Sequence, residues 1–168
     1  LPEWLVYRKI TQTGKLAQRL GADMLGLGAY TSVVGDAGFT IAERLNVPVT
    51  TGDTYTVAIA VEAIQQAAAR MDIVLQNSTA AVVGANGAIG SVCAELLADR
   101  VGRLLLIGKR PAALEAFKDR LLERGVRAEL HAETSLDALR ESQLTLAVTS
   151  DINAVIEPQH LPSGSVVC

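Results

Sequence analysis

The sequence predicts an α/β fold in which a doubly wound parallel sheet is preceded by part of a second α/β region. From residue 79 onward, short apolar runs alternate with helical patterns. These runs are almost continuously apolar, which is typical of parallel strands covered on both faces. A glycine-rich turn follows the first run and opens directly into a helix. Together these observations favour a sheet built from successive strand–helix units.

Each expected element of this later region follows from its apolar pattern. The expected strands are 79–83, 103–107, 127–131, 144–149 and 165–168, and the expected helices are 88–100, 112–124 and 135–141. The last strand ends at Cys168, and the chain opens on Leu1 rather than Met. We therefore expect an internal fragment of a longer protein, truncated at its carboxyl end.

The earlier region is less regular. We expect a helix over 2–20, a strand over 23–28, a short helix over 39–45, a strand over 47–51 and a helix from Asp53 or Thr54 to about Met71. Gly21 provides a C-terminal cap for the first helix, and Asp53 or Thr54 an N-cap for the last. We place a linker at 73–78 and a domain boundary between residues 75 and 76, which leaves the 1–75 region incomplete.

Composition excludes several classes of function. A net charge of −3 gives no reason to expect nucleic acid or an anionic membrane as a partner. No apolar stretch is long and uncharged enough to span a bilayer. The two cysteines, Cys93 and Cys168, form neither a disulfide framework nor a metal cluster. We expect a cytoplasmic protein with no metal site, and self-association into a homo-oligomer stays open.

The most informative segment is Ala81-Val-Val-Gly-Ala-Asn-Gly-Ala-Ile-Gly-Ser91. Gly84 permits a tight exit from the strand, Gly87 permits backbone to approach a pyrophosphate, and Gly90 permits close packing of helix on sheet. The helix N-terminus then favours the phosphates. This pattern is typical of a Rossmann-type dinucleotide-binding unit, although a similar turn without ligand stays open. The expected cofactor residues are Gly84, Asn86, Gly87, Ala88, Ile89 and Gly90.

Two further strand ends bear on the choice of cofactor. The second strand runs into Gly108-Lys109-Arg110, with no acid before Glu115. A carboxylate at this position would bond the ribose of NAD, whereas cations suit the 2′-phosphate of NADP. We therefore predict NADP, the alternative being a solvated basic loop. Thr149 and Ser150 end the fourth strand, where they would either contact the nicotinamide side of the cofactor or cap a turn.

Three motifs, at residues 25–34, 50–56 and 81–91, carry a family resemblance that covers nearly the whole chain. The chain resembles the long-chain acyl-[acyl-carrier-protein] reductases of cyanobacteria and their bacterial relatives, the predicted amino-acid or shikimate-type dehydrogenases. The resemblance implies an NADP-dependent oxidoreductase with 76–168 as the NADP-binding domain and 1–75 on the substrate side. It implies a small-molecule or acyl-thioester substrate, with acyl carrier protein as the carrier in the thioester case.

The catalytic residue is not assigned. In the reductases a cysteine takes the acyl group and NADPH releases it as an aldehyde, but neither Cys93 nor Cys168 matches that motif, and we expect both in the core. The resemblance places the cysteine beyond Cys168. Shikimate dehydrogenases carry a catalytic Lys that the turn at 50–54 lacks. The alternatives are a shikimate-like or amino-acid dehydrogenase and a non-catalytic nucleotide-binding module.

Polar residues at the strand ends of the earlier region are candidates for substrate contacts, because ligands in open α/β sheets bind beside such ends. The candidates are Tyr30, Thr31, Ser32, Thr51 and Asp53. Asp53 is more simply explained as a helix cap. The sequence gives no local structural reason for the hydroxyls at 30–32. His131 and His160 belong to no arrangement that would form a catalytic triad.

Overall fold

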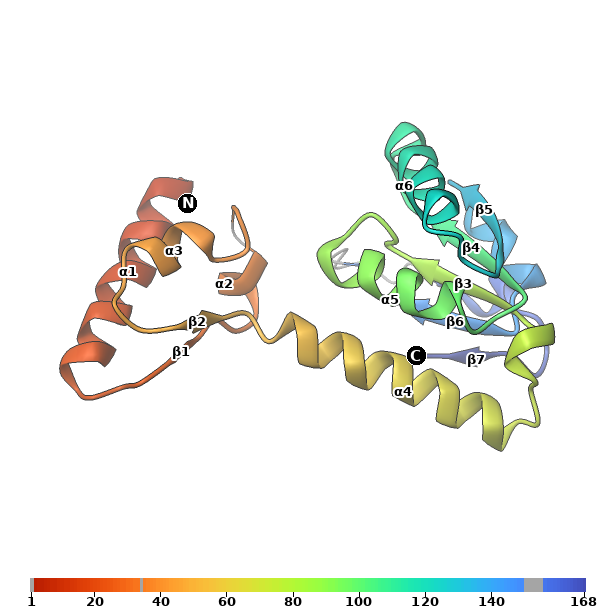
Figure 1. Cartoon of the computed structure of the whole chain (residues 1–168), viewed down its shortest axis with the longest axis horizontal. Coiled ribbons are helices and arrows are strands. Elements are labelled where there is room, and N and C mark those ends of the chain that lie inside the picture. The colour runs from red at the N-terminus through yellow and green to blue at the C-terminus, as the bar shows by residue number, and fades with distance from the viewer. Residues whose placement is uncertain (1, 34, 150–155) are drawn as a thin grey trace. The chain divides into compact units, whose positions relative to one another are not determined.

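The chain folds around two parallel sheets, each in its own unit (Figure 1). The computed structural model describes residues 2–33, 35–149 and 156–168. The units are Leu1–Tyr55 and Thr56–Cys168. The sequence places the domain boundary at residues 75 and 76 instead. The difference is helix α4 (Asp53–Arg70), whose buried residues belong to the core of the second unit.

The second unit contains a five-stranded sheet in the order β5-β4-β3-β6-β7, with every pair parallel. The strands are β3 (Thr79–Val83), β4 (Arg103–Ile107), β5 (Glu129–Glu133), β6 (Leu144–Ala147) and β7 (Val166–Val167). From β3 the chain first adds strands on one side, then returns to add β6 and β7 on the other. The predicted doubly wound parallel sheet is therefore confirmed.

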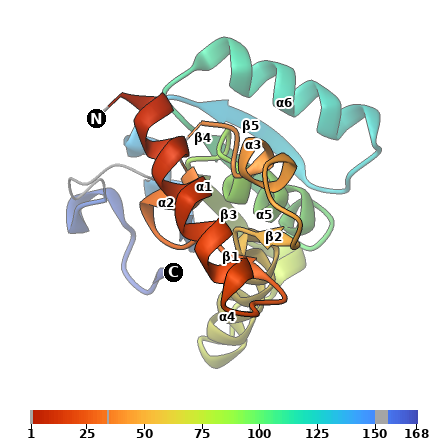
Figure 2. The same cartoon turned by 90° about the vertical axis from the view of Figure 1, so that its left-hand side faces the viewer.

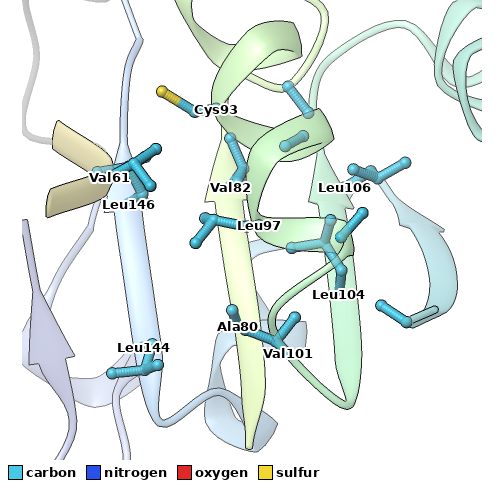
Figure 3. Packing of buried hydrophobic residues seen from close by; sticks show 14 of the residues in the cluster. Val61, Ala80, Val82, Cys93, Leu97, Val101, Leu104, Leu106, Leu144 and Leu146 are labelled. Atoms are coloured by element: carbon cyan, nitrogen blue, oxygen red, sulfur yellow. The ribbon is translucent and has the colours of Figure 1, made fainter. Parts of the chain in front are cut away.

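Helices pack on one face of this sheet, and Figure 3 shows side chains of the core between them. Its core includes Val82 and Leu104 from the strands, Leu97 from α5 (Ala88–Ala98), Leu114 from α6 (Pro111–Glu123) and Val61 from α4. Successive residues of β3 alternate between faces, so Ala81 and Val83 lie on the other side. There they pack with Leu139 of the 3-10 helix η2 (Leu136–Glu141). This division explains the continuously apolar strands.

Most expected elements agree with the structure, and the differences are local. The strand expected over 127–131 lies two residues later, because its pairing with β4 begins at Glu129. The helix expected over 135–141 is a 3-10 helix. The linker contains a short 3-10 helix, η1 (Leu75–Asn77), and another, η3 (Pro158–His160), precedes β7. No helix in the described ranges combines the length and apolarity needed to cross a membrane.

The first unit is built on two short strands. Its elements are α1 (Glu3–Arg19), β1 (Leu25–Gly26), α2 (Tyr30–Val33), α3 (Phe39–Glu43) and β2 (Val49–Thr50). Figure 2 faces this unit, with α1 beside α3. A Cβ on Gly14 would lie 2.5 Å from a methyl of Leu45, so glycine lets α1 pack closely on the small core of Leu27, Ile41 and Leu45.

Hydrogen bonds to one carboxylate hold the loop before α3. Thr40 donates its hydroxyl at 2.6 Å and its N–H at 2.9 Å to Asp36, and the Tyr7 hydroxyl donates at 3.2 Å. These bonds lower the pKa of Asp36, and the bond from the Thr40 hydroxyl has the largest effect. Asp36 therefore has a structural role in linking α1 to α3.

We expect Leu97→Ala to lower the free energy of unfolding by about 2–5 kcal/mol, because the side chain is fully buried and its removal leaves a cavity. Leu122→Ala is the matched control, since Leu122 is 53% exposed on α6, and its effect should stay within about 0.5 kcal/mol. Urea unfolding followed by circular dichroism measures both. Equal effects would contradict the packing described.

Candidate functional site

The candidate site lies where β3, β4 and β6 end. A cavity of about 230 Å³ opens there. It is lined by Gly84, Asn86, Gly87, Gly108, Lys109, Arg110, Val148 and Thr149. From β3 the chain continues to β4 on one side of the sheet order, and from the neighbouring β6 it continues to β7 on the other side. In open α/β sheets ligands bind at such a switch point, outside the carboxyl ends of the strands. Residues far apart in the sequence are thus brought to one opening.

Gly84 makes the turn out of β3 with φ at 89°, a left-handed conformation that side chains disfavour. Its N–H donates to the carbonyl oxygen of Ile107 at 2.8 Å. A Cβ on Gly84 would lie 2.7 Å from the carbonyl oxygen of Val148. Both the conformation and the space require glycine here, as the sequence predicts.

Gly90 and Gly87 serve the start of α5. A Cβ on Gly90 would overlap the carbonyl oxygen of Gly84 and lie 3.1 Å from a methyl of Val148. Gly90 therefore permits the predicted close packing of helix on sheet. Gly87 is the exposed N-cap residue, and a Cβ there would lie 3.2 Å from the Gly84 carbonyl oxygen.

The first turn of α5 combines packing with hydrogen-bond donors. Ala88 is exposed, whereas the side chain of Ile89 packs against the core. The first N–H groups of a helix have no partner within the helix and carry a partial positive charge. Ala88, Ile89 and Gly90 can therefore contribute through their backbone rather than their side chains.

Lys109 and Arg110 follow β4, and both are exposed at the cavity. Arg110 is also the N-cap residue of α6, and Pro111 begins that helix. No carboxylate is among the described residues that line the cavity. Thr149 lines it from the end of β6, whereas Ser150 lies outside the described residues. The opening thus presents two cations and a helix N-terminus to an anion.

Comparison with solved structures agrees with this architecture. One of the subunits of dipicolinate synthase from Bacillus halodurans superposes with a TM-score of 0.51 at 15% identity, covering 83% of this chain and 49% of that one. An L-alanine dehydrogenase superposes with a TM-score of 0.52 at 16% identity, covering 68% and 36%. The chain has a Rossmann-type fold.

Curated proteins that are similar in sequence to this Rossmann-type chain include a reductase and an aminotransferase, while no family model matches it. The long-chain acyl-[acyl-carrier-protein] reductase of Synechococcus elongatus is 33% identical over 185 residues, covering 99% of this chain and 52% of the reductase. The aminotransferase PigE of a Serratia species is 32% identical over 151 residues, covering 87% and 17%. The chain thus spans about half of one relative and a small part of the other.

The candidate substrate residues of the first unit do not gather in one cavity. Thr31 lines an apolar cavity of about 630 Å³ with residues of α1 and β1, such as Ile10 and Leu25. Thr51 lines another, of about 250 Å³, beside Phe39. The sequence predicts neither cavity. The apolar positions on one side of α1 are the signal that could have indicated the first.

Local hydrogen bonds account for several of these polar groups. The hydroxyls of Thr31 and Ser32 donate at 2.7 Å to the carbonyl oxygens of Gly28 and Ala29. Asp53 begins α4, and its N–H donates to the Thr51 hydroxyl at 3.4 Å. Tyr30 lies in α2, and its side chain is outside the described part of the structure. The structure thus supplies local roles that the sequence did not reveal.

The other nucleophiles and bases have structural explanations. Cys93 is buried, as expected, but Cys168 is exposed because it follows β7, the edge strand of the described sheet. His131 pairs with Glu129 at 2.8 Å, and His160 accepts a hydrogen bond from the N–H of Glu157 at 3.1 Å. Within the described ranges no group of three metal-ligating side chains occurs.

We expect iodoacetamide to modify Cys168 but not Cys93 in the folded protein. Desolvation raises the pKa of both thiols, and the thiolate is the reactive form. Modification of Cys168 should therefore be slow at pH 7 and faster toward pH 9, as measured by intact mass. Cys93 should react only after denaturation, and equal rates for both cysteines in the native protein would contradict the burial of Cys93.

Proposed function

We propose that the chain binds NADP(H) and forms the cofactor-binding part of a cytoplasmic oxidoreductase. The observation that carries the proposal is the shared cavity, in which the glycine turn after β3 faces Lys109 and Arg110 after β4. Each part matches a different portion of the cofactor.

The glycine turn suits the pyrophosphate. Side chains at Gly84, Gly87 or Gly90 would fill or narrow the space between β3, α5 and β6. Without them, the first-turn N–H groups of α5 are accessible to an anion. Backbone donors and a helix N-terminus together are a common way of holding phosphate.

The end of β4 suits the adenosine ribose of NADP rather than NAD. Lys109 supplies an ammonium and Arg110 a planar guanidinium, both of which bind phosphate. The described residues that line the cavity include no carboxylate, the group that bonds an unmodified ribose and would repel a 2′-phosphate. Charge at this strand end therefore favours NADP.

The end of β6 lies beside the expected nicotinamide half of the cofactor. We assign Thr149, with Ser150, to hydrogen bonds that orient this half. When bound, the nicotinamide supplies or accepts a hydride, while the protein contributes binding, orientation and electrostatics. Thr149 lines the same cavity as the glycine turn, which supports one continuous site.

For the substrate, the similarity to the acyl-[acyl-carrier-protein] reductase favours reduction of an acyl thioester to an aldehyde, with acyl carrier protein as partner. The apolar cavity that Thr31 lines suits the hydrocarbon part of such a substrate. Tyr30, Ser32, Thr51 and Asp53 are the remaining candidates for the substrate side. This substrate class rests on sequence similarity and on the apolar lining, and the cofactor proposal does not depend on it.

We expect the double variant Lys109→Glu, Arg110→Glu to bind NADPH about 10- to 100-fold more weakly, because two charge-assisted contacts become repulsive. Affinity for NADH should change by less than about 3-fold, since that cofactor lacks the 2′-phosphate. Isothermal titration calorimetry measures both. Lys15→Glu, Arg19→Glu on α1 is the charge-matched control. Equal wild-type affinities for NADPH and NADH, or no binding by folded protein, would overturn the proposal.

A further inference from the structure

Asn86 is a polar side chain within the glycine turn between β3 and α5. It lines the same cavity as Lys109 and Arg110. Its Oδ1 atom is shut off from solvent and has no hydrogen-bond partner among the described residues. A buried acceptor without a partner lowers stability, so an amide oxygen kept in this position directs attention to the other end of the amide, the NH₂ group.

The position of the amide is set by Gly108. A Cβ on Gly108 would lie 2.6 Å from Oδ1 and 3.7 Å from Cγ of Asn86. The amide oxygen therefore lies against the backbone that follows β4, in space that only glycine leaves open. Oδ1 and Nδ2 extend from the same carbon in different directions, and Nδ2 is not shut off from solvent. With the oxygen held against Gly108, the NH₂ group is the part of the amide available to the cavity.

A phosphate group offers acceptors and no donors once ionised, so a site for it requires donors. The amide NH₂ of Asn86 carries two, and it does so without a charge that would attract other anions. Lys109 and Arg110 border the same opening and supply positive charge. The donors on these three residues therefore come from both sides of the cavity, the glycine turn and the end of β4.

We propose that Asn86 is a third specificity-determining residue of the 2′-phosphate site, donating from Nδ2 to a phosphate oxygen, and that Gly108 is required to hold its amide in place. This inference rests on the proposed binding of NADP. It adds a neutral donor from the glycine turn to the two cations, and it explains why glycine stands directly before Lys109. Binding of the phosphate would give Nδ2 an acceptor, while Oδ1 stays against Gly108.

The test uses 2′,5′-ADP and 5′-AMP as ligands, because they differ only in the 2′-phosphate. Calorimetry should show that Asn86→Ala lowers the affinity for 2′,5′-ADP by about 10-fold or more, the loss expected for one hydrogen bond to a charged group. The same variant should change the affinity for 5′-AMP by less than about 2-fold. Asn86→Asp should lower the affinity for 2′,5′-ADP further, because a carboxylate repels the 2′-phosphate. The affinity for 5′-AMP should again change little.

Gly108→Ala is a second route to the same result. It leaves Asn86, Lys109 and Arg110 in the chain but places a methyl 2.6 Å from Oδ1, so the amide must move. This variant should therefore also lose affinity for 2′,5′-ADP while keeping its affinity for 5′-AMP. Asn77→Ala is the control, since Asn77 is exposed in η1, just before β3 and at the opposite end of that strand. It should leave both affinities unchanged.

The outcomes separate this inference from the proposal beneath it. If wild-type protein prefers 2′,5′-ADP and Asn86→Ala keeps that preference, the role of Asn86 is wrong and NADP binding stands. If Asn86→Ala lowers the affinity for both ligands equally, Asn86 only shapes the turn, and the inference is again overturned. If wild-type protein shows no preference for 2′,5′-ADP, the NADP proposal fails and this inference fails with it.

Discussion

The close approach of three backbone segments, at the end of β3, the start of α5 and the end of β6, is the constraint on which the candidate site depends. Gly84 lies against the Val148 carbonyl, and Gly90 lies against the Gly84 carbonyl. Any side chain at these positions would push the segments apart. The approach places the N-terminus of α5 at the carboxyl ends of β3 and β6, the two strands between which the strand order reverses. It thus creates both the opening and the donors that face it.

The charged groups among the described residues around this opening are positive, as is the partial charge of the helix N-terminus that faces it. The protein carries a net charge of −3, yet the cavity is bordered by Lys109, Arg110 and a helix N-terminus. An overall negative surface disfavours non-specific binding of anions, whereas a local positive site attracts them. The proposed ligand has two separated phosphate groups, one for each part of the opening. The first unit, by contrast, contains an apolar cavity, which suits a different kind of molecule.

Sequence reasoning succeeded where a pattern has one physical cause. The sequence predicts the limits of β3 and β4 because each strand is apolar after its first residue, and it predicts the glycine turn because the glycine spacing reflects close packing. It did less well for β5, an edge strand whose Glu129, His131 and Glu133 give no apolar run. The local partners of Thr31 and Ser32 depend on backbone geometry, including the positive φ of Ala29. The contact between Asn86 and Gly108 joins neighbouring strand ends and leaves no pattern along the chain.

The central claim is that the turn between β3 and α5 holds a dinucleotide, and a nuclear magnetic resonance titration of ¹⁵N-labelled protein with NADP⁺ tests it most directly. The account predicts saturable shifts of the backbone amides from Gly84 to Gly90, together with those of Gly108, Lys109 and Thr149. Amides of β5 should not move, because that strand lies at the far edge of the sheet. Shifts confined to the first unit, or none in folded protein, would contradict the account.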